Sequence, residues 1–283
     1  MMSDNRFEPI NQAHAIVEMV LFFEFISPEP DKNIERLLPL RSELEDDFPS
    51  YELLEVVEFN FGPSVPDSTP QQVQPKTGGF ELRRFKSDGS FEWLIRFTQK
   101  SISIHCLEYT RWKNVWEKVN VYSGKVFDKL AGTNINLSSI GLRYLDQFVF
   151  CGDPKNYDAR LLLNPSSSLL CSRAFISGAR WHCYSGWFEE AKGLGEILGQ
   201  VNLDSVVSNV DENRRATVLI DQVFTRRAQS ETELMQYMTP GKIGSECRSN
   251  LAQWMHDANK KLLSDLLNDT VRSRISLYLD EMP

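Results

Sequence analysis

Four residues, Ser87-Asp88-Gly89-Ser90, lie between two apolar and aromatic runs and constrain the fold of this 283-residue chain more than any other feature. Asp-Gly is typical of a two-residue hairpin turn, and the length of the turn fixes which residues face each other across the two strands. The pairs expected from this register are Glu81 with Arg96, Arg84 with Trp93, and Phe80 with Phe97. One face of the hairpin is then aromatic and consists of Phe80, Phe91, Trp93, Ile95 and Phe97.

A long amphipathic helix is expected after this hairpin. A third strand, from Ile102 to Tyr109, leads into residues 111–130, where apolar side chains recur with a 3.6-residue period. The apolar positions are Trp112, Val115, Trp116, Val119, Val126, Phe127 and Leu130. Because an apolar stripe must be covered, we expect this helix to lie across the sheet.

The region before the hairpin begins with another strand. Residues 15–25 are mostly β-branched or aromatic, which favours extended structure. A helix capped by Asp31 is expected next, and Pro39 must kink or restart it. A strand through Glu55 then precedes residues 62–79, which contain four prolines and no apolar period, and which we expect to form a surface loop.

The second part of the chain repeats this order of elements. A strand from Ile140 to Phe150 precedes three further strands, expected around residues 175–187, 197–207 and 216–227, and a long helix around Leu251 to Leu262. We therefore predict an α+β fold with two similar halves, residues 1–135 and 136–283. Each half is expected to be a curved antiparallel sheet backed by a long amphipathic helix. One continuous sheet is the alternative.

Composition excludes several classes of protein. With 41% hydrophobic residues and 17 Phe, the chain can bury a large core. Acidic residues outnumber basic ones 39 to 31, and the net charge of -8 opposes non-specific attraction to nucleic acid or anionic lipid. The longest apolar run, residues 16–26, is too short to span a bilayer, and no basic segment typical of a signal peptide precedes it.

Cysteine and histidine usage argues against a metal centre. The five cysteines are odd in number and show no C-x-x-C spacing, which disfavours both a disulfide framework and a zinc site. None of the four histidines has a second histidine four residues later. We expect reduced thiols, a cytoplasmic location, and neither a metal nor another cofactor.

The strand expected at Ile140 to Phe150 carries the most informative polar residues. Alternation places Tyr144 and Asp146 among apolar side chains on one face, and Arg143 on the other. A carboxylate on an apolar face must be paired, hydrogen-bonded or protonated. This is how a binding or catalytic carboxylate is tuned, and also how a structural one is held. Arg143 is most simply explained as a structural ion-pair partner.

The sequence resembles a sporadically distributed, uncharacterised family of bacterial proteins in two segments. One is the motif Ile140-Gly141-Leu142-Arg143-Tyr144-Leu145-Asp146, and the other is the apolar segment His14 to Phe25. The resemblance covers most of the chain, although Asp146 replaces the Asn that is usual in the family. It implies no particular activity. Sporadic distribution is typical of accessory genes, which indicates a bacterial defence or toxin-neutralising module as the setting.

Catalytic motifs are weak in this chain. Glu190-Ala191-Lys192 fits the E-x-K half of a metal-dependent nuclease site, with Asp153 or Asp158 as a further Mg²⁺ ligand. A solvated strand end explains the same residues. The pairs His105-Cys106 and His182-Cys183 point to opposite faces of a strand, so neither pair forms a dyad by itself.

Clusters of basic and aromatic residues offer another class of site. Such clusters occur near Arg84 and Trp93, at residues 111–118 and at residues 214–227. A nucleic-acid surface uses Arg for phosphates and aromatic rings for stacking, but the same residues also serve as strand-edge charges. Trp181 and Trp187 share one strand face, as core residues or as interface anchors.

These patterns favour a non-catalytic cytosolic binding protein that acts through a protein partner. The alternative is a nucleic-acid-binding protein or a metal-dependent nuclease. The candidate binding residues are Arg143, Tyr144, Asp146, Arg84, Trp93, Trp181 and Trp187. A strongly positive sheet face would favour nucleic acid, whereas an apolar groove rimmed by acidic residues would favour a protein partner.

Overall fold

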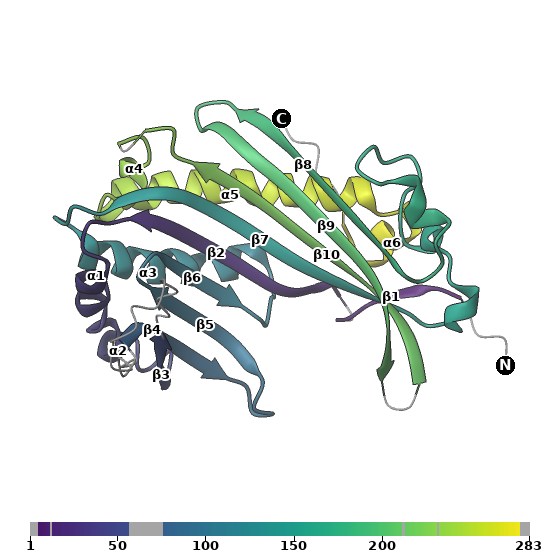
Figure 1. Ribbon diagram of the computed structural model, residues 1–283, viewed down its shortest axis with the longest axis horizontal. Coiled ribbons are helices and arrows are strands. Elements are labelled where there is room, and N and C mark those ends of the chain that lie inside the picture. Colours follow the sequence, from purple (N-terminus) through teal and green to yellow (C-terminus); the bar gives the residue numbers. More distant parts are fainter. Residues whose placement is uncertain (1–4, 12, 57–75, 211–212, 231, 278–283) are drawn as a thin grey trace, which may run out of the picture.

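The computed structural model describes residues 5–11, 13–56, 76–210, 213–230 and 232–277. These residues form an α+β fold in which one large, open antiparallel sheet is accompanied by a few helices (Figure 1). No helix in these ranges is long and apolar enough to cross a membrane.

The sheet has ten strands within the described ranges. They are β1 (Phe7–Pro9), β2 (Ile16–Ile26), β3 (Ser50–Val56), β4 (Lys76–Phe85), β5 (Phe91–Thr98), β6 (Ser101–Cys106), β7 (Asn136–Phe150), β8 (Trp181–Ala191), β9 (Gly195–Val210) and β10 (Asn213–Arg227). Their spatial order is β3-β4-β5-β6-β2-β7-β10-β9-β8, and β1 pairs with β7. The sheet is continuous because β2 and β7 are antiparallel neighbours.

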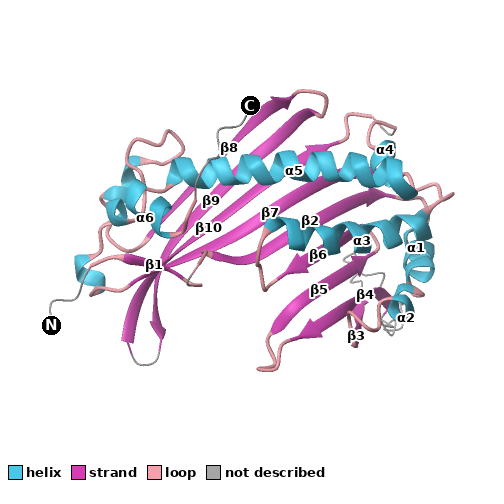
Figure 2. Ribbon diagram, turned by 180° about the vertical axis from the view of Figure 1, so that it is seen from behind, coloured by secondary structure: helices cyan, strands magenta, loops and turns pink. Residues whose placement is uncertain are grey.

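The helices differ widely in length. They are α1 (Pro30–Leu37), α2 (Leu40–Glu43), α3 (Trp112–Leu130), α4 (Met235–Met238), α5 (Gly241–Leu266) and α6 (Asp269–Arg274), and three short 3₁₀ turns lie between β7 and β8. The two longest, α3 and α5, lie on the same face of the sheet (Figure 2). The core lies between this face and the helices, and the opposite face, called here the open face, carries no helix in either view.

Helices α3 and α5 contact each other through a ladder of hydrogen bonds. The bonds join Trp112 Nε1 to Gln253 Oε1 (2.7 Å), Trp116 Nε1 to Ser249 Oγ (3.1 Å), and Asn120 Nδ2 to Ser245 Oγ (2.8 Å). Residue numbers rise by four on α3 as they fall by four on α5, so the helices are antiparallel with about one bond per turn. Trp112 and Trp116, expected to face the core, are therefore only partly buried, because each indole N–H needs a partner at this seam.

The hairpin of β4 and β5 confirms the predicted register. Glu81 faces Arg96, Arg84 faces Trp93, and Phe80 faces Phe97. The turn itself is longer than expected, because Lys86 N donates to Ser90 O and encloses three residues. An extra residue on β5, Glu92, compensates for this length. Beyond that bulge the alternation of faces reverses, so Phe91 stacks on Phe85 and does not join the aromatic core face.

The other sequence expectations differ from the structure mainly at boundaries. Pro39 restarts the helix, since α1 ends at Leu37 and α2 begins at Leu40. Strand β4 begins at Lys76, so residues 76–79 of the expected loop are extended, and residues 57–75 lie outside the described ranges. The helix expected to be capped by Asp31 starts two residues earlier, at Pro30, with Glu29 at its cap position.

Gly141 permits close packing where β2 and β7 pair on the open face. A Cβ atom at Gly141 would lie 2.1 Å from Cζ of Phe22, its neighbour across the pair. The ring of Phe22 thus occupies the space that any other side chain would need. The glycine of the central motif has a packing role.

Phe127→Ala tests whether α3 is part of the core. Phe127 is fully buried and its ring lies edge-on to Phe23, with 5.0 Å between centroids. We expect the substitution to lower the free energy of unfolding by about 3–5 kcal/mol, as for other large-to-small core changes. Urea denaturation measures this, with Val121→Ala on the exposed side of the same helix as control. Equal effects of the two substitutions would contradict the packing described.

Candidate functional site

Strand β7 places the polar residues of the central motif on both faces of the sheet. Tyr144 and Asp146 are buried beneath α5, and Arg143 is on the open face. The predicted alternation is confirmed from Leu142 to Phe150. The motif therefore contributes to two separate environments, one inside the protein and one facing solvent.

Asp146 is enclosed without a cationic partner. Its side chain is 1% exposed, and Oδ2 accepts a hydrogen bond from Gln222 Nε2 at 2.9 Å. Its second oxygen, Oδ1, has no hydrogen-bond partner among the described residues. Burial raises the pKa of this carboxyl from its ordinary 3.8 to about 7, and the bond from Gln222 offsets the rise only in part. The expected partner is thus present, and it is a side-chain amide.

A second polar contact lies next to this carboxyl, between the sheet and α5. Tyr144 Oη and His256 Nδ1 are joined by a hydrogen bond of 2.9 Å, and the His256 ring stacks on Trp112 with 4.4 Å between centroids. Burial lowers the pKa of His256 to about 4, so its imidazole is neutral at pH 7. His256 therefore supplies no positive charge to Asp146 at neutral pH.

A cavity of about 70 Å³ lies at this interior cluster. Its lining residues are Ile16, Tyr144, Asp146, Gln222, His256, Asn259, Lys260, Leu263 and Leu277. They come from β2, β7, β10, α5 and the segment that follows α6. The site is thus assembled from residues distant in the sequence.

On the open face, Arg143 is the centre of a network of charges. Its Nε and Nη2 atoms donate to the two carboxylate oxygens of Asp221, at 2.7 and 2.8 Å, and its Nη1 lies 3.7 Å from Glu18. Glu18 in turn contacts His105 Nδ1 at 2.8 Å. The pKa of Glu18 is lowered, first by this bond and then by the nearby guanidinium groups. Arg143 thus belongs to a polar network whose members lie on four neighbouring strands, β6, β2, β7 and β10.

Other arginines of the open face are also paired with carboxylates. Arg83 and Arg96 both donate to the buried side chain of Glu81. Arg143 is paired in the same way with Asp221, so each of these three arginines has a carboxylate partner on the open face.

The last strand of the sheet, β8, borders an apolar groove of about 330 Å³, called here the β8 groove. Its apolar lining comprises Trp187, Phe224, Leu169, Leu262 and Ala258, and its charged lining comprises Glu189, Asp265 and Lys261. Trp187 lies edge-on to Phe224, with 6.0 Å between ring centroids. No strand in the described ranges pairs with the outer edge of β8.

Trp181 lies at the other end of β8 and is a core residue. Its Nε1 donates to Tyr157 Oη at 3.0 Å, and Ser205 Oγ donates to the same oxygen at 3.0 Å. Because its ring is buried and its N–H is satisfied, Trp181 offers no surface to a partner. Trp187 alone of the two tryptophans reaches a groove.

Arg84 and Trp93 are cross-strand partners, as the predicted register has them. Trp93 is buried against Tyr122, and the cation over its ring is Lys118 Nζ, 5.4 Å from the centroid. Arg84 instead donates from Nε to Glu92 at 2.8 Å. The bulge at Glu92 places this acceptor beside the guanidinium, and a charged hydrogen bond is stronger than a contact with a ring.

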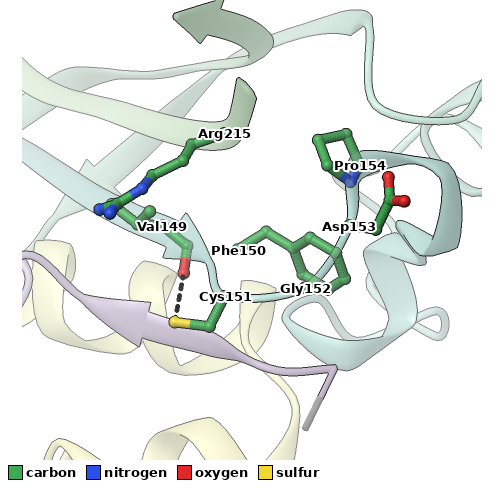
Figure 3. A pocket seen from close by; sticks show the side chains of 7 residues that line it. All are labelled: Val149, Phe150, Cys151, Gly152, Asp153, Pro154 and Arg215. Atoms are coloured by element: carbon green, nitrogen blue, oxygen red, sulfur yellow. Dashed lines mark hydrogen bonds between the residues drawn. The ribbon is translucent and has the colours of Figure 1, made fainter. Parts of the chain in front are cut away.

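A cavity of about 540 Å³ lies where β7 ends (Figure 3). It is lined by residues 149–154 and by Arg215. An adjacent cavity of about 350 Å³ includes Lys155 and Arg180. Arg215, Lys155 and Arg180 form no ion pair with a carboxylate within the described ranges. The side chain of Arg214 lies outside the described residues, and Arg226 is buried and paired with Glu233.

The nuclease-like residues are separated in the structure. Glu190 and Lys192 are exposed near the β8–β9 turn, whereas Asp153 and Asp158 accept backbone hydrogen bonds at the starts of two 3₁₀ turns. Within the ranges that the structure describes, no group of three or more His, Cys, Asp or Glu side chains could hold a metal ion.

The sequence did not reveal the residues that α5 and β10 contribute to the interior cluster. Gln222, His256 and Asn259 were not singled out, although each lies in a predicted strand or helix. One signal for Asn259 was present in the sequence, because it continues the series Leu251 and Met255 at a spacing of four residues. A polar residue at such a position is expected on the buried side of the helix, and Asn259 is as buried as the other two. Phe224 and Asp265 of the β8 groove carried no such signal.

Comparisons with protein-family models, with curated proteins and with solved structures gave no match. The chemistry of these sites is therefore argued from their geometry.

The buried carboxyl of Asp146 makes stability depend on pH. The pKa of Asp146 is about 7 in the folded protein, against an ordinary value of 3.8, so folding favours the protonated carboxyl. The stability that this protonated carboxyl contributes is fully present below about pH 4 and is lost as pH rises through 7. We expect Asp146→Asn to become more stable relative to the unsubstituted protein by about 2–3 kcal/mol between pH 5 and pH 8. Urea denaturation at both pH values measures this change.

Glu196→Gln, an exposed acid on β9, is the control for this experiment, because its side chain is solvated in the folded protein. Parallel stability curves for Asp146→Asn and the unsubstituted protein would show that Asp146 does not titrate in this range.

Proposed function

We propose that this chain is a non-catalytic, cytosolic binding protein that acts through a protein partner. The observation that carries the proposal is the β8 groove, whose lining is mainly apolar and includes Glu189 and Asp265, and which lies beside a sheet edge that no described strand pairs with. Aromatic residues in such grooves are typical anchors of protein interfaces.

The unpaired edge of β8 favours an extended partner segment. Backbone N–H and C=O groups at the edge of a sheet can pair with an added strand, and pockets on its two faces then select alternate side chains. On one face the added strand meets the β8 groove and Trp187. On the other it meets Tyr184 and Phe188, two aromatic side chains that are largely exposed. Both faces of β8 offer apolar contacts.

Charge around β8 favours a basic partner segment. The exposed side chains include Glu189, Glu190, Glu196 and Asp265, against Lys192 and Lys261. Acidic residues thus outnumber basic ones, and a segment that combines apolar and basic residues complements this surface. The resemblance to a sporadically distributed bacterial family supports a defence or toxin-neutralising module as the setting.

We also propose that residues 1–135 and 136–283 are two similar units. In each, the strand that pairs with the other unit also pairs with the last strand of its own unit, as β2 does with β6 and β7 with β10. In each, a long helix, α3 or α5, comes after the last strand, and both helices lie on the same face of the sheet. Separate expression of each unit, followed by hydrogen exchange of its backbone amides, tests the proposal. Protection of the strands and the long helix in one unit but not in the other would contradict the similarity.

Phe188→Ser tests the role of the β8 edge. Phe188 is 63% exposed, so its loss should leave stability within about 0.5 kcal/mol while removing an apolar contact for the partner. We expect at least a tenfold lower yield of the partner in affinity capture from a host lysate, quantified by mass spectrometry. Nuclease treatment of the lysate shows whether capture depends on nucleic acid.

Ile243→Ser is the matched control, because Ile243 is 67% exposed and lies at the start of α5, away from β8. A partner retained by Ile243→Ser and lost with Phe188→Ser supports docking at β8. Equal retention by both variants would rule out this edge.

Nucleic-acid binding is the second candidate function, and the basic residues of the two cavities beyond β7 favour it. A variant with Lys155→Ala, Arg180→Ala and Arg215→Ala would remove three cations that have no carboxylate partner among the described residues. If this surface binds phosphates, the affinity for a labelled single-stranded oligonucleotide, measured by fluorescence anisotropy, should fall at least tenfold and depend less on salt. Unchanged binding would exclude this surface.

A further inference from the structure

Two cysteine side chains, Cys171 and Cys183, lie against each other beside the β8 groove. The backbone N–H of Cys171 donates a hydrogen bond to Sγ of Cys183, at 3.4 Å, and the two side chains also interact directly. Both cysteines are free thiols in the structure. Because Cys171 lies outside the strand that carries Cys183, the fold itself brings the two sulfur atoms together.

The geometry allows a bond between the two sulfur atoms. Because an N–Cα bond is about 1.46 Å long, Sγ of Cys183 lies within about 4.9 Å of the Cα atom of Cys171. In most disulfides the two Cα atoms are roughly 5.5–6 Å apart. Cys183 is fixed on β8, whereas Cys171 precedes the 3₁₀ turn Ser172–Phe175 and is exposed. Rotation of the Cys171 side chain is therefore the main movement that a bridge requires.

The two thiols differ in their access to solvent, which gives them different roles. Cys171 is exposed, so a small oxidant in solution can approach it. Cys183 is 5% exposed, and burial raises the pKa of its thiol, which keeps it protonated at neutral pH. The N–H of Cys171 points at this sulfur and stabilises negative charge on it when the proton leaves. Cys171 is thus the residue oxidised first, and Cys183 is the residue that then attacks it.

We propose that Cys171 and Cys183 are a redox-modified pair, which hydrogen peroxide converts to a disulfide and which thiol reductants return to two thiols. In the first step the Cys171 thiolate attacks a peroxide oxygen, the O–O bond breaks, and a sulfenic acid and a hydroxide ion form. In the second step the Cys183 sulfur attacks the sulfenic sulfur and the S–O bond breaks. The released hydroxyl group takes the Cys183 proton and leaves as water. The two thiols lose two electrons and two protons in total, and one peroxide becomes two water molecules.

The bridge would lie next to a wall of the β8 groove. Leu169 lines the groove, and its backbone oxygen accepts hydrogen bonds from Ser185 Oγ at 2.9 Å and from Cys183 Sγ at 3.7 Å. Ser167 Oγ donates to Asp265 of α5, which also lines the groove. Residues 167–169 thus connect α5 to β8 through hydrogen bonds. A covalent bond from Cys171 to β8 would hold this wall more firmly.

A bridge of this kind differs from a structural disulfide. Structural disulfides are found in oxidising compartments, whereas those of reducing compartments are usually transient or redox-sensing. The five cysteines are odd in number and all are free, which agrees with one inducible pair among otherwise separate thiols. The bridge is therefore expected only under oxidising conditions. This modification does not depend on the function proposed for the β8 groove.

Peptide mapping by mass spectrometry tests the proposal. Trypsin cleaves after Arg173 and Arg180, so the two cysteines fall on different peptides, residues 161–173 and 181–192. After treatment with hydrogen peroxide and alkylation of the remaining thiols, we expect these peptides to be joined and to weigh two hydrogen atoms less than the separate pair. Dithiothreitol should separate them again.

Cys171→Ser should leave Cys183 a free thiol after the same treatment. Cys151→Ser, at another exposed cysteine, is the matched control and should leave the joined peptides unchanged. In the bridged protein the backbone amides around Leu169 and Ser185 should exchange hydrogen more slowly, by roughly threefold or more, because the wall of the groove opens less often. Cys171→Ser should not show this change.

Unlinked peptides at a peroxide concentration that oxidises Cys151 would overturn the proposal. The same holds if Cys171 is found as a sulfinic acid, or bridged to another molecule, while Cys183 stays free. Equal exchange rates in the bridged and reduced protein would overturn the effect on the wall of the β8 groove.

Discussion

The antiparallel pairing of β2 with β7 is the interaction on which the rest of the structure depends. It runs without a shift from Glu18 opposite Leu145 to Glu24 opposite Ser139, and it joins one strand from each of the two parts of the chain. Without this pairing the sheet would divide into two smaller sheets, each with an exposed edge. Helices α3 and α5 meet above the same junction, so their hydrogen-bond ladder reinforces it.

Strand β7 shows how one strand can meet opposite electrostatic requirements on its two faces. Arg143 is half in solvent and has two carboxylates within reach, so its charge is balanced. Asp146, three residues later, is enclosed and has one amide. A paired charge stabilises a structure, whereas a buried carboxyl without a cationic partner has its pKa shifted toward the neutral form, as at Asp146.

The fold class, the hairpin register and the faces of β7 could be predicted because they follow from local rules, namely turn chemistry and the two-residue period of strands. The position of Phe91 could not, because the bulge at Glu92 depends on how the turn closes. The partly exposed positions of Trp112 and Trp116 depend on α5, more than a hundred residues away. Gln222 and Asn259 are likewise far from Asp146 along the chain, which explains why Asp146 was found from the sequence and these two neighbours were not.

The contact between Phe22 and Gly141 bears on how the central motif should be interpreted. An aromatic ring lies there against backbone that carries no side chain, so the glycine of the motif is explained by packing and contributes no reactive group. Substitution of Gly141 by alanine would displace the ring of Phe22 toward solvent, and an apolar side chain would then protrude from the open face. Relatives identified through this glycine would thus share the way two strands fit together, and could bind quite different molecules.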